Sequence, residues 1–330
     1  MKKTAKRYLF IFMLIIIILT TYVLLRAHKV KLPEEISTVY KVRIMEVLSI
    51  TEHSLREEEI NYICSLLDTE VLWEPIEWDE KMSEEITPEI EKKSDIITEH
   101  YEILSSGIII LCNVIDNCKD RDILMDKITL AINKLLNEQS KDGSWYGETF
   151  VLYTSLNIRA LNYYYNISND KKVLFSIKKA NSWFVEGYRT SRNNMRSIYA
   201  CFYSNFVYNL PEGLREESIL KELKEIYLKK GEEIFGFEGI ILPDPTFIPI
   251  ALLNSDLLNV AEKEKLSETI IRIIGEKTKG FKDFNNLGPS NNIRCGYYLL
   301  NCWKYANPEK KPLIKKLLKQ NAKALRKFLE

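Results

Sequence analysis

Residues 137–161 read NEQSKDGSWYGETFVLYTSLNIRAL, a stretch that predicts two helices joined by a tight polar turn. Gln139 ends the first helical pattern, and DGSW at 142–145 is turn chemistry, because glycine frees the backbone while Asp and Ser side chains bond nearby main-chain groups. Trp145 has the bulk to lie between two helix ends. From 149 to 161 apolar residues recur with helical spacing. The stretch therefore predicts a helical hairpin.

This turn resembles the QW motif, Gln-x-x-Asp-Gly-Ser-Trp, of the terpenoid cyclases and protein prenyltransferases. The matching residues are Gln139, Asp142, Gly143, Ser144 and Trp145. In that superfamily the motif joins an outer helix to the following inner helix of an α/α toroid, in which a ring of inner helices is surrounded by outer ones. The resemblance implies an all-α toroid and a structural role for this turn.

A second feature is an alternation along the chain between amphipathic, Lys-rich helices and aromatic, Lys-poor helices. The predicted outer and inner pairs are 122–138 with 149–165, 171–186 with 194–208, 216–233 with 246–258, and 262–277 with 292–306, followed by a last outer helix at 312–329. Outer helices need a charged face toward water, whereas inner helices are enclosed. A solenoid of stacked pairs has the same alternation, so closure into a toroid is implied by the resemblance alone.

Two further helix starts resemble the same superfamily. Residues 194–200, NMRSIYA, are similar to the Asp-x-Arg-x-x-Tyr-x-Ala start of a prenyltransferase repeat, with Arg196 and Tyr199 kept and Asn in place of Asp. The sequence DPT at 244–246 is similar to the second half of the Asp-x-Asp-Asp-Thr-Ala segment of class II terpene cyclases. With the QW-like turn, the resemblance covers residues from 120 to 306.

The residues that would carry the chemistry of these families are incomplete. A prenyltransferase is implied to hold zinc through Asp, Cys and His, but no His follows His100, which excludes that activity; no metal or other cofactor is predicted. A class II cyclase protonates an alkene with a strong carboxylic acid. Here Leu242 and Pro245 stand at two acidic positions, leaving Asp244 alone. We expect Asp244 to be a helix N-cap, with the catalytic acid as the alternative.

The predicted ligand site follows from the helix starts. If the inner helices begin around one mouth, their first turns meet there. The predicted lining is Glu148, Tyr153, Asn194, Arg196, Asp244, Thr246, Asn292 and Arg294 at the rim, with Tyr199, Tyr203, Tyr297 and Tyr298 below. A polar rim over an aromatic wall suits an isoprenoid chain or a glycan. The alternative is that these tyrosines are packed core whose hydroxyls find partners.

Three functions remain open from the sequence. The favoured one is a toroid protein that binds an extended ligand in its central cavity, with divergent or lost catalysis. An exported glycan hydrolase or lyase is the alternative, and Glu148 with Asp244 is then the only carboxyl pair that we nominate. A divergent terpenoid cyclase that uses Asp244 is the third. Whether the protein is an enzyme stays open.

The N-terminus predicts attachment to the cell membrane. Residues 8–25 are 18 uncharged residues that follow Lys2, Lys3, Lys6 and Arg7, about the minimum for a membrane-spanning helix. No small-x-small cleavage site follows, so an uncleaved single-pass anchor is favoured over a cleaved signal peptide, with the rest outside the cytoplasm. We therefore divide the chain into an anchor (1–29), membrane-proximal helices with an acidic connector (30–94), and the toroid (95–330).

Charge is unevenly distributed although the net charge is +1. Residues 52–102 hold 17 acidic and four basic side chains, and residues 310–327 hold eight basic and no acidic ones. Such blocks usually indicate solvated helix faces rather than lipid or nucleic-acid patches. Aromatic and basic residues are not interleaved, so no nucleic-acid partner is expected. The six cysteines form no C-x-x-C pair, and most have apolar neighbours typical of buried thiols.

Overall fold

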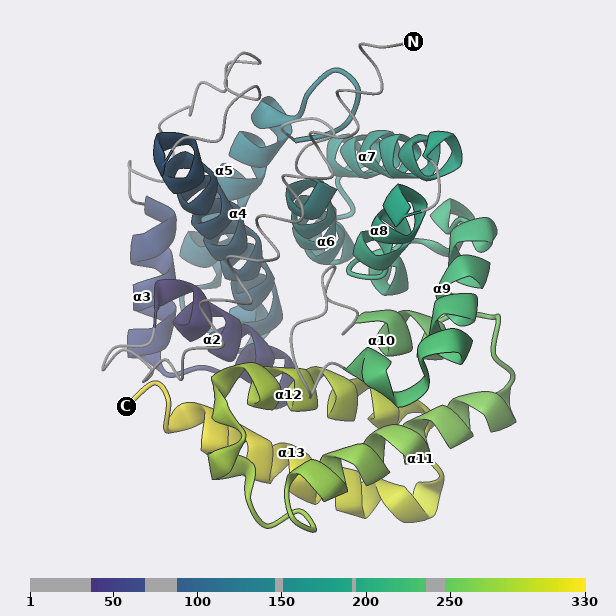
Figure 1. Cartoon of the computed structure of the whole chain (residues 1–330). Helices are drawn as coiled ribbons and strands as arrows, with labels where there is room; N and C mark the ends of the chain where they lie inside the picture. Colours follow the sequence, from purple (N-terminus) through teal and green to yellow (C-terminus); the bar gives the residue numbers. More distant parts are fainter. Residues whose placement is uncertain (1–36, 69–87, 146–150, 192–193, 236–246) are drawn as a thin grey trace.

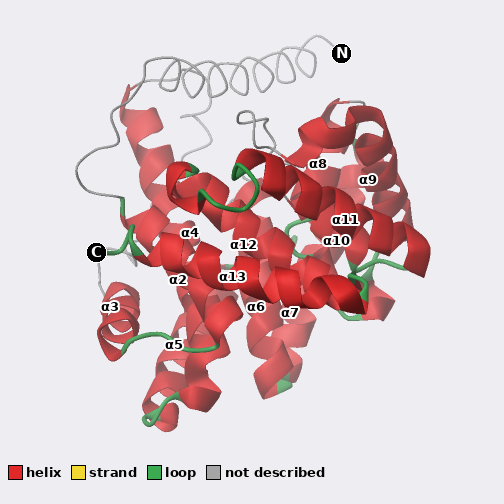
Figure 2. Ribbon diagram, turned by 90° about the horizontal axis from the view of Figure 1, so that it is seen from below, coloured by secondary structure: helices red, strands yellow, loops and turns green. Residues whose placement is uncertain are grey.

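The computed structural model describes residues 37–68, 88–145, 151–191, 194–235 and 247–330, and these residues form helices and no strands (Figures 1 and 2). The α-helices are α2 (Thr38–Glu52), α3 (Glu57–Asp68), α4 (Pro88–Val114), α5 (Arg121–Glu138), α6 (Val151–Ser168), α7 (Lys171–Thr190), α8 (Asn194–Tyr203), α9 (Glu217–Lys230), α10 (Phe247–Leu253), α11 (Val260–Lys277), α12 (Gly288–Tyr305) and α13 (Lys311–Arg326). The predicted all-α class is confirmed. Within these ranges no helix is both long and apolar enough to cross a membrane, and the predicted anchor at 8–25 lies outside them.

Two of the helices that the sequence predicts as inner helices end earlier than expected. α8 stops at Tyr203 because the Ser204 hydroxyl donates to the Cys201 carbonyl oxygen at 2.5 Å, and the chain turns there. α10 stops at Leu253, where the Asn254 side-chain amide donates to the Ile250 carbonyl oxygen at 2.8 Å. Short polar side chains that bond the preceding turn in this way compete with helix continuation.

The even-numbered helices lie toward the middle of the molecule and the odd-numbered helices lie around them (Figure 1). α5, α7, α9 and α11 each pack against the helix before and the helix after them in the chain. The last two helices return to the first described one, since both α12 and α13 pack against α2, and α2 packs against α4. Segments from the two ends of the described chain are therefore neighbours.

α2 belongs to the same hydrophobic core as the later helices. Its side chains Val42, Ile44, Val47 and Leu48 are fully buried. α12 approaches it at Gly296, where an added Cβ would lie 2.3 Å from Val47 Cγ1, so only glycine permits this contact. The domain boundary expected at 94/95 stays a prediction, while the described residues on its two sides share one core.

Ion pairs reinforce the return of α13 to the first helices. Arg326 of α13 donates to Glu52 Oε2 of α2 at 2.5 Å and to Glu59 Oε1 of α3 at 3.0 Å. Glu59 also accepts from the Arg56 guanidinium at 2.8 Å, which fixes the start of α3. Glu59 is nearly fully buried; burial raises its pKa, but the bonds from Arg56 and the charge of Arg326 more than offset this and leave its pKa below the usual value.

The QW-like turn is tightly packed. Trp145 is fully buried and its indole Nε1 donates to the Leu135 carbonyl oxygen of α5 at 2.9 Å. Its backbone N–H donates to Thr154 Oγ1 of α6 at 3.0 Å. The indole is thus bonded to the helix before the turn and the main chain to the helix after it, as expected for a residue that joins the two.

The polar residues of the turn fasten it to α7. The Gln139 amide donates to the Ser176 carbonyl oxygen at 3.1 Å and accepts from the Ser176 hydroxyl at 2.8 Å. Asp142 accepts from the Ser144 N–H at 2.9 Å. Gly143 has φ of +105°, and a Cβ there would lie 2.5 Å from the Lys179 carbonyl oxygen, so the glycine is required for both reasons. The turn therefore connects three helices rather than two.

His100 predicts a pH dependence of stability. Burial on α4, with a smaller contribution from Lys134, lowers the pKa of His100 from 6.5 to about 4. Between these values the unfolded state binds a proton that the folded state does not. Stability should therefore fall by about 3 kcal/mol as pH drops from about 6.5 to about 4.

Urea unfolding of wild type and His100→Leu across this pH range measures the effect. The loss of unfolding free energy between pH 6.5 and pH 4 should be smaller in His100→Leu by about 3 kcal/mol. His53→Asn is the matched control, because His53 is exposed and asparagine tolerates its positive φ of 52°. An identical pH profile for wild type and His100→Leu would contradict the assignment.

Candidate functional site

A buried ionic cluster lies where three of the middle helices meet. Glu46 of α2, Arg159 of α6 and Tyr297 of α12 are between 1 and 7% exposed. The Arg159 guanidinium pairs with the Glu46 carboxylate and donates to the Tyr297 hydroxyl at 2.9 Å. The Tyr297 hydroxyl in turn donates to Glu46. These three side chains, which we call the axial cluster, connect helices that are 113 and 251 residues apart in the sequence.

Aromatic side chains cover the Arg159 guanidinium. Arg159 Nε donates to the Tyr208 hydroxyl at 3.1 Å, and its Cζ lies 5.2 Å from the Phe247 ring centroid. The Tyr208 and Phe247 rings are parallel within 2°, with centroids 6.2 Å apart. Both are partly exposed, unlike the axial cluster beneath them. This pair, which we call the aromatic platform, is the accessible part of the site.

The electrostatics fix the protonation of the tyrosines. Burial raises the pKa of Tyr297 far above its usual value, more than Arg159 lowers it, and burial likewise raises the pKa of Tyr208. Burial lowers the pKa of Arg159, but the charge of Glu46 and the nearby tyrosines raise it by more, so its pKa lies well above the usual value. At neutral pH the tyrosines are therefore neutral hydrogen-bonding groups and Arg159 is a cation paired with Glu46. Neither tyrosine is suited to act as a phenolate base.

Three predicted lining tyrosines are fully or almost fully buried, and their surroundings are protein. Tyr203 accepts from the Glu216 N–H at 2.9 Å. Tyr199 packs edge-on against the Phe184 ring, with centroids 5.9 Å apart. Tyr298 donates to the Phe235 carbonyl oxygen at 3.3 Å. Among the predicted tyrosines, the site described above includes Tyr297 alone, and ligand binding by the other residues stays a prediction.

The remaining described candidates are dispersed. Tyr153 is buried and stacks on Tyr101 with centroids 5.3 Å apart. Arg196 is exposed, lies over the Tyr188 ring at 4.4 Å and donates to its hydroxyl at 2.6 Å. Arg294 is buried and donates to Asn291 Oδ1 at 3.1 Å. Arg196 thus contacts residues of α7 and α9 and is not part of the axial cluster of α2, α6 and α12.

Both predicted catalytic carboxyls, Glu148 and Asp244, lie outside the described residues, so their roles stay predictions. The side chains of Asn194 and Thr246 are also outside the described part. Within the described ranges, no group of three or more His, Cys, Asp or Glu side chains is placed to hold a metal ion.

Glu46, Arg159, Tyr208 and Phe247 are the residues of this site that the sequence prediction missed. A signal for two of them was present. Glu46 has two apolar residues on each side in IMEVL, and Arg159 is the only charged residue in the aromatic segment VLYTSLNIRALNYYY. A charge inside an otherwise apolar helix requires a buried partner, and these two have opposite signs.

Comparison with known proteins adds no relative: no family model, no curated protein and no solved structure matches the chain.

Proposed function

We propose that the chain is a membrane-anchored α/α-toroid protein that holds an extended ligand against the aromatic platform, with the catalysis of the toroid enzymes that it resembles lost or divergent. The anchor is the apolar segment 8–25, and the helical domain lies outside the cytoplasm. The observation that carries the proposal is the pair of partly exposed aromatic rings, Tyr208 and Phe247, held over a buried, fully paired arginine.

The toroid part of the proposal is supported by the contacts at the two ends of the chain. A solenoid leaves its first and last helices apart, whereas here α12 and α13 pack on α2. The helices predicted from residue 122 onward correspond to five odd-numbered helices, α5 to α13, and to four even-numbered helices, α6 to α12. In the toroid, α2, α3 and α4 would supply the remaining helices. In this arrangement α2, α4, α6, α8, α10 and α12 are the inner helices.

Ligand binding is supported by the chemistry of the platform. Aromatic faces contribute binding energy both to isoprenoid chains and to the apolar faces of sugars. The Arg159 cation beneath is already neutralised by Glu46, so it stiffens the platform without requiring an anionic ligand. A partly exposed pair of parallel aromatic rings suits an elongated ligand that packs against it.

Loss of cyclase chemistry is supported by the sequence around Asp244 and by the role of the axial carboxylate. Leu242 and Pro245 replace two acidic positions of the cyclase segment. Glu46, the buried carboxylate of the axial cluster, is engaged by both Arg159 and Tyr297. Alkene protonation needs a carboxylic acid with a proton to give, which an ion-paired carboxylate lacks.

A binding and turnover experiment tests the proposal. The purified full chain in detergent is titrated with squalene, a linear isoprenoid diphosphate, or a soluble oligosaccharide, and the thermal midpoint and the reaction products are recorded. One ligand class should raise the midpoint, because a ligand that binds only the folded state stabilises it, and no ligand should be converted. Phe247→Ala should weaken this binding about tenfold or more, whereas Phe175→Ala, at an exposed position on α7, should leave it unchanged.

Conversion of squalene or a diphosphate to cyclised products that disappear in Asp244→Asn would contradict lost catalysis and establish a divergent cyclase. Cleavage of the oligosaccharide would establish the glycan enzyme instead. Equal binding by wild type and Phe247→Ala would remove the platform from the site.

A further inference from the structure

The last helix, α13, presents a basic face that no described acidic residue neutralises. Lys315, Lys316, Lys319 and Lys323 are all exposed, and none has an ion pair with a described residue. The helix contains six Lys and Arg residues and no acidic one. Its other face is apolar, with Ile314, Leu317 and Leu325 buried against the core. α13 is therefore strongly amphipathic and its charged stripe is free to contact a partner.

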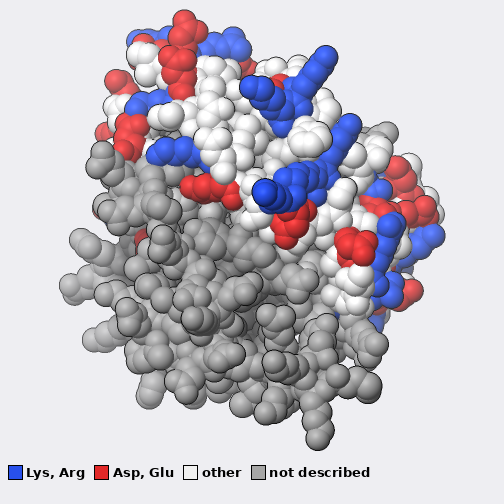
Figure 3. Space-filling model, turned by 90° about the horizontal axis from the view of Figure 1, so that it is seen from above, with Lys and Arg blue, Asp and Glu red and all other residues white. Residues whose placement is uncertain are grey.

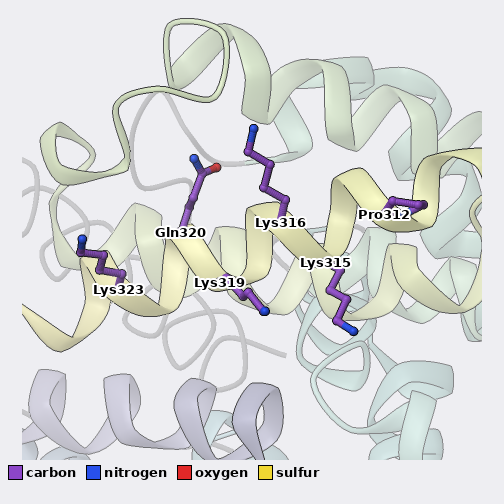
Figure 4. A pocket seen from close by; sticks show the side chains of 6 residues that line it. All are labelled: Pro312, Lys315, Lys316, Lys319, Gln320 and Lys323. Atoms are coloured by element: carbon purple, nitrogen blue, oxygen red, sulfur yellow. The ribbon is translucent and has the colours of Figure 1, made fainter.

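A shallow groove of about 500 Å³ lies on this face (Figure 4). It is lined by Pro312, Lys315, Lys316, Lys319, Gln320 and Lys323, all from α13. Lys316, Gln320 and Lys323 point to one side of the helix, and Lys315 and Lys319 point to the other. The methylene stems of the lysines make an apolar surface bordered by ammonium groups, which is the form that lysines adopt at a lipid–water interface.

An exposed tryptophan extends the same surface. Trp303 of α12 is 37% exposed, and Lys311 of α13 lies over its ring, with Nζ 5.7 Å from the centroid. Lys311 is four residues before Lys315 and eight before Lys319, so the three share one row of the helix. Tryptophan beside lysine is the combination enriched at the headgroup level of membranes.

The opposite face of the molecule differs in its charge. Seen from above, the part of the surface that described residues form has Lys and Arg interspersed with Asp and Glu (Figure 3). α13 lies across the face seen from below (Figure 2). In that view basic and acidic residues occur together, whereas α13 contains no acidic residue.

We propose that the α13 face, formed by Lys315, Lys316, Lys319 and Lys323 with Lys311 and Trp303, docks on the anionic phosphate headgroups of the membrane in which the chain is anchored. The tether permits this contact. Twelve residues, 26–37, separate the apolar segment from α2 and can extend about 40 Å. α2 itself packs directly against α13. This inference rests on the proposed anchoring and adds the side of the domain that faces the lipid.

Lysine labelling in bilayers of defined charge tests the docking. The full chain is placed in nanodiscs of phosphatidylcholine alone or with phosphatidylglycerol, and a membrane-impermeant amine reagent is followed at each lysine by mass spectrometry. The four lysines and Lys327 should label at least about fivefold more slowly in the anionic discs, the factor expected when one lysine is attracted to an anionic surface. Lys171, Lys172 and Lys178 on α7, which lies far from α13 in Figure 1, should label equally in both. Molar salt should abolish the difference, because it shortens the screening length to about 3 Å.

Two matched variants identify the charges responsible. In Lys315→Gln/Lys316→Gln/Lys319→Gln/Lys323→Gln, the reporter Lys327 should label in anionic discs as fast as in neutral ones. In the control Lys171→Gln/Lys172→Gln/Lys178→Gln/Lys229→Gln, which removes four exposed lysines from α7 and α9, Lys327 should stay protected.

Equal labelling of the α13 lysines in neutral and anionic discs would overturn the proposal. So would equal protection by soluble polyphosphate in neutral discs, which would assign the face to a soluble polyanion. Carbonate extraction of the same samples distinguishes failure of the docking from failure of the proposed anchor. A chain that resists extraction but labels equally has an anchor without docking. A chain that is extracted lacks the anchor itself.

Discussion

Replacing Trp145 by alanine should lower the free energy of unfolding by about 3 to 5 kcal/mol, the range for a buried aromatic truncated to alanine. The side chain is fully buried and its indole N–H is bonded to Leu135. The truncation removes apolar contacts and leaves a cavity in the turn that joins α5 to α6. Denaturant unfolding of the detergent-solubilised full chain, followed by far-ultraviolet circular dichroism, measures the loss.

Two control variants separate the effect of truncating a buried side chain from the effect of replacing a tryptophan at any position. Trp145→Phe keeps most of the apolar volume and loses only the indole hydrogen bond, so it should cost about 1 to 2 kcal/mol. Trp303→Ala, at a position that is 37% exposed, should cost less than about 1 kcal/mol. An unchanged unfolding midpoint for Trp145→Ala would contradict the packing of the QW-like turn.

Replacing Arg159 by methionine should be comparably severe, at about 3 to 5 kcal/mol, because it leaves the Glu46 carboxylate buried without its counter-charge. Methionine retains most of the aliphatic length, so the cavity contribution is small. Glu46 is 1% exposed, so solvent does not reach it to take the place of the guanidinium. The same unfolding experiment measures the loss. Arg189→Met is the matched control, since Arg189 forms an exposed pair with Glu216 and should contribute less than about 1 kcal/mol.

The double variant Glu46→Met/Arg159→Met distinguishes a lost ion pair from general damage. Removal of both charges eliminates the unpaired carboxylate, so the double variant should be more stable than Arg159→Met alone by about 2 kcal/mol or more. Simple addition of the two single losses would show that the side chains are not coupled, and it would contradict the axial cluster.

The sequence predicts the helices from residue 121 onward well, because the periodicity within each helix agrees with the way in which the helices pack. The helices from α5 to α13, apart from α8 and α10 which end early, lie close to their predicted ranges, since Lys-rich and aromatic segments alternate regularly. The packing of α2 could not be predicted in the same way. Residues 30–94 follow an apolar segment and are strongly acidic in their later part, which predicts membrane-proximal helices and an acidic connector, and this division of the chain stays a prediction. α2 packs on α4 and on α12, which is more than 230 residues away, and no local pattern reports such a contact.

The candidate site was less predictable than the fold. Tyr297 was a predicted ligand residue and lies in the axial cluster, but its hydroxyl is bonded to Glu46 and Arg159. The prediction chose polar residues at helix starts, whereas Arg159 is in the middle of α6 and Tyr208 lies after the end of α8. Spacing along single helices cannot show which inner side chains meet, because that depends on the rotation of each helix in the assembly.

A disulfide between α2 and α12 tests the central claim, that the helical pairs close on themselves through α2. A Cβ at Gly296 would lie 3.6 Å from Val47 Cβ, which is within the range for a disulfide. The variant Val47→Cys/Gly296→Cys, with the adjacent Cys295 changed to alanine, is oxidised mildly and analysed by peptide mass mapping. A control pairs Val47→Cys with Lys304→Cys, on the same helix at an exposed position. The closed arrangement predicts an intramolecular 47–296 disulfide and none in the control; two free thiols at 47 and 296 after oxidation of the folded variant would contradict it.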